Sequence, residues 1–240
     1  IQSSNPSGLT VSTETYCSSS PSTNALFVST PSAIIENVTL NGQTNNINNN
    51  TAGVPDLYED YTASIYADIT EGQSYTVNLI LGDLSGGSYP TGAKVFIDYN
   101  IDGDFDDTGE EIGILNCTWA APLVGSINFT VPSTGAFGPT RMRVVSQDAF
   151  ATTTSTIGPC DYADPSITND APWFGATEDY SIVLNAPTLS ATFLWDNGQN
   201  RLDSYAANSA RVVIKGDAVD LAYPNIYGCC HPDWDARYVD

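Results

Sequence analysis

Residues 95–113 have the sequence VFIDYNIDGDFDDTGEEIG, and this stretch decides the fold that we expect. It begins as an apolar strand and then places seven carboxylates in a short turn. Charges of one sign at this density repel each other, so the turn needs either a cation or full exposure to water. We expect the rest of the chain to form a β-scaffold around it.

The composition limits the classes of partner. The chain has 240 residues, 28 acidic against 7 basic side chains, and a formal net charge of −21. Phosphate binding needs Lys and Arg, so nucleic acid and anionic membrane surfaces are not expected partners. No apolar run approaches the roughly 18 residues of a membrane span, so we expect no membrane insertion. Strong acidity is typical of secreted surface proteins, and the start Ile1-Gln2-Ser3-Ser4 fits a mature, processed chain.

The five cysteines predict an oxidising compartment. In an acidic, Thr-rich secreted chain they are expected to form disulfides. Cys17 and Cys160 bracket most of the strand-rich region, so their pairing would join its two ends. Cys117 is then left for Cys229 or Cys230, and the odd count leaves one thiol over or one bond between chains.

Period-2 alternation of apolar and polar residues predicts seven or more short strands. The Asn-rich segment 45–50 is expected to be an exposed loop, and residues 160–174 a long loop. Many short strands separated by turns favour an all-β fold, a β-sandwich of jelly-roll or Ig-like type. The expected strands are residues 34–40, 61–69, 75–81, 93–99, 126–131, 140–145 and 179–184.

Changes in composition and in apolar alternation along the chain indicate three regions. Residues 1–15 form an N-terminal arm, residues 16–186 the main sandwich, and residues 187–240 a smaller C-terminal, Ig-like β-region. In the last region we expect strands at 188–195 and 211–216, which are few for an independent domain of this size. This region is therefore expected to lean on the first domain or to be completed by another subunit.

The order of several motifs resembles the GEVED domain of secreted bacterial surface proteins of the Bacteroidetes type. The resemblance spans residues 16–186, and the namesake pentapeptide is here Gly-Ala-Thr-Glu-Asp at 175–179. It implies an extracellular β-sandwich accessory module on a bacterial cell surface, without known catalytic activity. The motifs are Tyr16-Cys17, Tyr61-Thr62, the acidic stretch, Thr140-Arg141-Met142-Arg143-Val144, Pro159-Cys160 and residues 175–181.

The acidic turn predicts a structural Ca²⁺ site. Asp98, Asn100 and Asp102 alternate and Gly103 follows, which is the opening of an EF-hand-type loop. The closing Glu of that loop is replaced by Gly109, so a later Glu would have to serve. The alternative is a solvated acidic hairpin. The candidate ligands are Asp98, Asn100, Asp102, Asp104, Asp106, Glu110 and Glu111.

Two segments predict a structural ion pair. Arg141 and Arg143 lie in one expected strand and Glu178 and Asp179 in another, and a buried Arg–carboxylate pair would fix the register of the sheet. We see no Ser or Cys within a nucleophile motif, and abundant carboxylates alone are a weak sign of glycoside hydrolysis. We therefore expect no enzyme.

The N-terminal arm predicts how copies of the chain assemble. Leu9, Val11 and Thr13 alternate outside the main domain, as in a spare strand. A strand donated to another subunit completes its sheet, and head-to-tail use of such a joint builds a filament. We thus expect a homopolymer, a pilus-like extracellular fibre. The alternative is a module of a secreted adhesin that binds surface glycans or protein, with Trp119, Trp173, Trp195 and Trp234 as stacking residues.

Overall fold

The structure is a computed structural model of the chain that describes residues 9–20, 33–51, 57–82, 89–118, 122–148, 156–163, 171–187, 189–195 and 201–207. The chain divides into two compact units, Ile1–Asn185 and Ala186–Asp240, which we treat separately. Within the described ranges, no helix has the length and apolar character that crossing a membrane requires.

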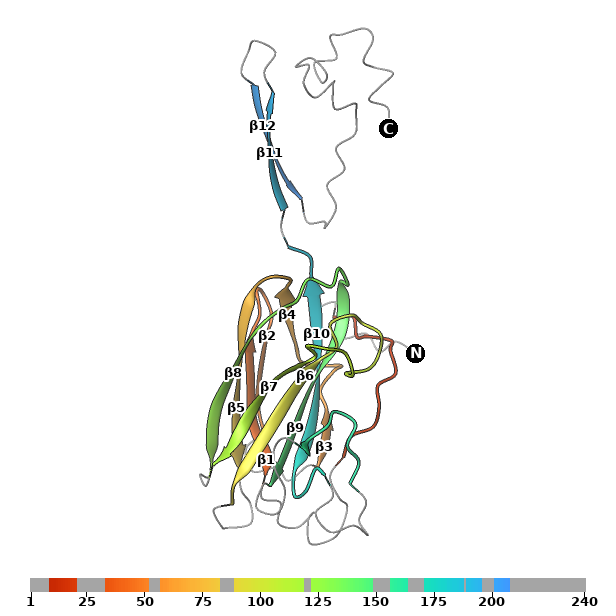
Figure 1. Cartoon of the computed structure of the whole chain (residues 1–240), viewed down its shortest axis with the longest axis vertical. Helices are drawn as coiled ribbons and strands as arrows, with labels where there is room; N and C mark the ends of the chain where they lie inside the picture. The colour runs from red at the N-terminus through yellow and green to blue at the C-terminus, as the bar shows by residue number, and fades with distance from the viewer. Residues whose placement is uncertain are drawn as a thin grey trace. The chain divides into compact units, whose positions relative to one another are not determined.

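A four-stranded antiparallel sheet forms one layer of the first unit (Figure 1). We call it sheet A, and its strand order is β2-β1-β5-β8. Apolar residues alternate along its strands, which buries one face and leaves the other to solvent. The strands are β1 (Ile34–Asn41), β2 (Asn46–Asn50), β5 (Ser74–Gly82) and β8 (Leu123–Thr130).

Six strands form the second layer, sheet B, in the order β3-β10-β9-β6-β7 with β4 also paired to β10. β3 and β4 follow one another along the same edge of β10 and run parallel to it, whereas the other pairings are antiparallel. The strands are β3 (Tyr58–Asp60), β4 (Tyr66–Thr70), β6 (Thr91–Ile97), β7 (Glu111–Thr118), β9 (Gly138–Asp148) and β10 (Ala176–Asn185).

The core lies between the two sheets and confirms the predicted β-sandwich. Val38 and Leu79 of sheet A, together with Val95, Val144 and Ile182 of sheet B, are fully buried in one apolar cluster. Full burial of such a side chain stabilises the fold by about 1.5–3 kcal/mol.

Two predictions about strands are wrong. The Asn-rich segment predicted as a loop is the strand β2, in which Ile47 and Asn49 are buried and the Asn49 amide donates to the Tyr180 hydroxyl at 2.8 Å. The predicted strand 61–69 is interrupted, because the amides of Ser64 and Ile65 both donate to the Tyr61 carbonyl and form a turn before β4. β7 was not predicted.

The second unit contributes a two-stranded antiparallel sheet of β11 (Leu189–Trp195) and β12 (Arg201–Ala207). β11 coincides with a strand that the sequence predicts. The strand expected at 211–216 lies outside the described residues, so the Ig-like form of this region stays a prediction.

Candidate functional site

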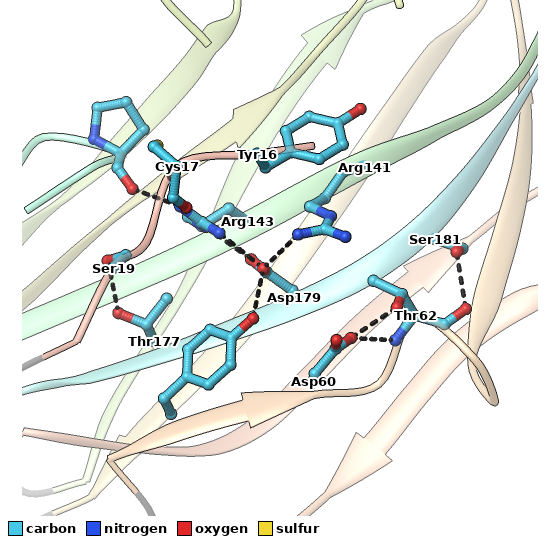
Figure 2. A network of polar contacts seen from close by, with 12 residues as sticks. Tyr16, Cys17, Ser19, Asp60, Thr62, Arg141, Arg143, Thr177, Asp179 and Ser181 are labelled. Carbon is cyan, nitrogen blue, oxygen red and sulfur yellow. Dashed lines mark hydrogen bonds and ion pairs between the residues drawn. The ribbon is translucent and has the colours of Figure 1, made fainter. Parts of the chain in front are cut away.

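A buried ion pair on sheet B is the centre of the candidate site (Figure 2). Asp179 of β10 lies opposite Arg143 of β9 in the antiparallel register. The Arg143 Nε and Nη2 atoms donate to the two carboxylate oxygens of Asp179, each at 2.7 Å. Both residues are almost fully buried, so this bidentate pair lies where the dielectric constant is low and charge-assisted hydrogen bonds are strong.

The remaining nitrogen of Arg143 fastens two distant chain segments. Nη1 donates to the carbonyl of Cys17 at 2.9 Å and to the carbonyl of Pro159 at 2.8 Å. Cys17 and Cys160 form a disulfide, with 5.4 Å between their Cα atoms. One buried cation and one disulfide therefore hold the N-terminal segment and the 156–163 segment against the outer face of sheet B.

A second arginine and two tyrosines complete the network. Arg141 Nη1 and the Tyr58 hydroxyl donate to Asp179 at 3.1 and 3.0 Å. The Arg141 guanidinium lies 4.3 Å from the centre of the Tyr16 ring, a cation–π contact. Burial and the nearby Asp179 charge raise the pKa of Tyr58 to about 12, so this phenol stays a proton donor at neutral pH. We call Tyr16, Cys17, Tyr58, Arg141, Arg143, Cys160 and Asp179 the N-terminal clamp.

Glu178 does not take part in the ion pair, and its predicted role is wrong. Successive residues of a strand point to opposite faces, so Glu178 points into the sandwich while Asp179 points outward. Glu178 accepts a short hydrogen bond from the Tyr180 hydroxyl. Burial, with the Glu59 carboxylate as a further cause, raises the pKa of Glu178 to about 8.

The glycine at the first position of the Gly-Ala-Thr-Glu-Asp motif is explained by steric crowding. A Cβ atom on Gly175 would lie 1.8 Å from the Ser146 carbonyl oxygen of β9, so only glycine fits where β10 begins. Three positions of the motif therefore have separate structural roles. Gly175 leaves room for the β9 backbone, Glu178 lies on the inner face of sheet B, and Asp179 lies on its outer face.

The acidic turn is organised from within by Asp98. Its carboxylate is fully buried and accepts from the backbone amides of Ile101 at 2.6 Å and Gly103 at 3.1 Å. It also accepts from the Tyr16 hydroxyl at 2.7 Å, which joins the turn to the N-terminal clamp. Gly103 has φ +95°, and a Cβ atom there would approach Glu14 within 3.2 Å.

Only part of the predicted Ca²⁺ ligand set comes together. The Asp98 carboxylate is already occupied by hydrogen bonds from two amides of the turn and from the Tyr16 hydroxyl, and Glu111 pairs with Lys94 at 2.8 Å. Glu110 is buried and accepts from the Tyr99 and Asp107 amides; burial, more than the neighbouring charges, raises its pKa to about 7.

A smaller group of carboxylates remains at the surface of the turn. Asp102, Asp104 and Asp107 place carboxylate oxygens within 4.8 Å of one another, and all three are exposed. The Asn100 amide donates to Asp102 and Asp107, whereas Asp106 is not in the group. Asp107 was absent from the predicted ligand set. This donor set suits a hard cation such as Ca²⁺, and calcium binding at the turn stays a prediction.

The other predicted site residues are partly outside the described structure. Leu9, Val11 and Thr13 lie in a segment without regular secondary structure. Cys229 and Cys230 lie outside the described residues, as does the side chain of Cys117. Among the four tryptophans only the ring of Trp173 is described, and it packs edge-on against Phe174.

Fold and site together define a class of protein: a β-sandwich domain whose N-terminal segment is fastened across one sheet by a disulfide and a buried ion pair. Residues 92–183, from β6 to β10, match the family of the GEVED domain. The resemblance inferred from the motifs is confirmed for this segment, which contains the acidic turn, both arginines and Asp179. No curated protein matches the chain.

Proposed function

We propose that the chain is a non-catalytic structural subunit of an extracellular bacterial filament, in which the N-terminal arm of one subunit completes a sheet of the next. The observation that carries this proposal is the two-stranded sheet β11–β12, because neither outer edge pairs with another described strand. A sheet of two strands is marginally stable in water, and a third strand would stabilise it.

The N-terminal clamp supports the same proposal. It begins at Tyr16, directly after the arm, so that pulling force on the arm would be passed to sheet B through the disulfide and through Arg143. Proteins that must withstand extracellular conditions commonly use disulfides, because the unfolded chain is constrained.

Alternation in the arm gives a test with a matched control. In a donated strand, Leu9, Val11 and Thr13 would face the acceptor core and Thr10 would face solvent. We expect Val11→Asp to abolish long polymers in electron micrographs and to reduce the mass measured by light scattering. Thr10→Asp adds the same charge one residue away and should leave polymers intact.

Two outcomes would reject the proposal. One is a wild-type chain that remains a stable monomer at all concentrations; the other is identical polymers after removal of residues 1–15. If the monomer is instead retained on a polysaccharide column, the alternative of a glycan-binding accessory module of a secreted adhesin is supported.

A further inference from the structure

Sheet A has an outer face that is almost without charge, in a chain of net charge −21. Glu36 is the one charged residue in strands β1, β2, β5 and β8, and its carboxylate lies over Gly82 at the end of the sheet. Every strand of sheet B, in contrast, carries at least one charged residue. The outward positions are Asn37, Thr39, Asn41, Asn46, Asn48, Asn50, Ser74, Thr76, Asn78, Ile80, Val124, Ser126, Asn128 and Thr130.

The side chains of this face are ordered by hydrogen bonds that run across the strands. The Ser126 hydroxyl donates to Asn78 at 2.7 Å, and the Asn78 amide donates to Thr39 at 3.1 Å, which forms one row over three strands. Thr76 donates to Asn128 at 2.7 Å in the next row. The face is therefore a regular array of amides and hydroxyls.

An apolar pair lies beside these rows. Ile80 and Val124 are opposite each other in the β5–β8 register, and Val124 is 66% exposed. A partner that covered this pair would gain hydrophobic stabilisation without meeting a charge.

Among the described residues, the exposed acidic side chains of the first unit belong to none of the strands of this face. They are Glu14 of the N-terminal segment, Asp60 of β3, Asp102, Asp104, Asp106 and Asp107 of the turn between β6 and β7, and Glu111 of β7. Packed sheets are about 10 Å apart, whereas charges are screened over about 8 Å at physiological salt. Two copies that met through sheet A would thus keep these acids more than one screening length from the contact.

We propose that the outer face of sheet A binds the same face of a second copy of this chain. Amides and hydroxyls both donate and accept hydrogen bonds, so the array is complementary to itself under a two-fold axis. A carboxylate-rich surface has acceptors only and repels its own copy. The net charge disfavours an anionic partner, and a cationic partner would be drawn to the acidic turn instead.

The contact is lateral and goes beyond the proposed function. It requires neither the arm nor the β11–β12 sheet, so a chain that forms no filaments would still pair through sheet A. Where filaments form, many weak contacts along two of them would act together and produce bundles.

Amide-to-acid substitutions test the proposal with little change of shape. In Asn78→Asp/Asn128→Asp the hydroxyls of Thr76 and Ser126 can still donate to residues 128 and 78, and the Thr39 hydroxyl, which accepts from the Asn78 amide, can turn and donate to the new carboxylate. We expect this full-length variant to lose lateral association at least about tenfold in 0.15 M NaCl, measured by sedimentation and by bundle width in micrographs. The loss should shrink in 1 M NaCl, where screening is stronger.

The control adds the same two charges in exposed turns outside the face, as Gln43→Glu/Gln73→Glu. It should leave lateral association unchanged within about twofold. Equal losses in the two variants, or a wild type that shows neither paired particles nor bundles, would overturn the proposal. Shortened filaments with unchanged pairing would count against the filament proposal and leave this one standing.

Discussion

Asp179 and Arg143 face each other across strands β10 and β9 and form a bidentate ion pair with almost no exposure to solvent. Removal of one partner leaves a buried, uncompensated charge, which costs far more than the net contribution of the pair. We expect Asp179→Asn to lower the free energy of unfolding by about 3–5 kcal/mol, measured by urea denaturation at pH 7.

The matched comparison is Glu111→Gln, which breaks the pair between Lys94 and Glu111. The Glu111 side chain is 47% exposed and that of Lys94 10% exposed, whereas neither partner of the Asp179 pair is exposed, so this loss should be smaller than the loss at Asp179. Similar losses at Asp179 and Glu111 would contradict the view that the clamp is a buried electrostatic centre.

The disulfide and Arg143 are expected to be energetically coupled. Cys17 and Cys160 are 143 residues apart, and closure of so long a loop predicts a loss of about 4–5 kcal/mol for Cys17→Ser/Cys160→Ser. Arg143→Met removes the donor to the carbonyls of Cys17 and Pro159, which the disulfide also holds.

A double-mutant cycle measures this coupling. The combined variant should lose less stability than the sum of the separate losses, by about 0.5–3 kcal/mol, because removal of either link already loosens the segments that the other link holds. The same cycle with Lys94→Met in place of Arg143→Met should be additive. Additivity in both cycles would show that the two links act independently.

The sheet arrangement was readable from the sequence where apolar residues alternate, as in β5 and β9. It was not readable in β2, because Asn residues supply no apolar pattern and Asn49 is buried by a hydrogen bond to Tyr180 that only the folded chain provides. The predicted strand 61–69 began too early for a related reason: Tyr61 belongs to the turn before β4 although its neighbours alternate.

The candidate site was readable in part for physical reasons. Arg141 and Arg143 lie in one expected strand, and at two residues apart they share a face, so both meet Asp179. Glu178 and Asp179 are adjacent and therefore lie on opposite faces of the strand. Which of the two contacts the arginines depends on which face of the strand packs against the other sheet. Asp98 has the spacing of a metal ligand, but backbone amides within its own loop satisfy it.

Glu178 predicts a dependence of stability on pH. Its pKa is raised to about 8 in the folded protein, chiefly by burial, and returns to about 4.5 on unfolding. The folded state therefore holds a proton that the unfolded state releases, so stability falls as the pH rises from about 4.5 to about 8. The groups that face it are Glu59, Tyr180 and Thr51.

Glu178→Gln keeps the hydrogen-bonding shape and removes the titration. Relative to wild type, we expect the variant to be more stable at pH 8 than at pH 5, measured by urea unfolding across that range. A Glu14→Gln variant, altered at an exposed position, serves as the control and should leave the slope unchanged. Parallel pH profiles for wild type and Glu178→Gln would contradict the assignment.

Two different sets of Ca²⁺ ligands have been described for the acidic turn. One was predicted from the spacing of residues in the sequence, and the other is the group of carboxylates that lie close together in the structure. Both sets include Asp104. Asp106 belongs only to the set predicted from the sequence, and Asp107 belongs only to the set seen in the structure. If the turn holds Ca²⁺, calcium at a hundredfold its Kd stabilises the chain by about 2.7 kcal/mol, seen as a rise in Tm. We expect Asp107→Asn to remove this rise and Asp106→Asn to keep it.

The comparison remains informative when binding is weak, because each substitution removes one exposed negative charge and keeps the side-chain volume. Calorimetric titration with CaCl₂ should give a lower affinity for Asp107→Asn than for Asp106→Asn. The reverse order would restore the EF-hand-like spacing as the better guide. A Tm that calcium and a chelator leave unchanged in the wild type would reject the calcium site, and the turn would then be a solvated hairpin held by Asp98.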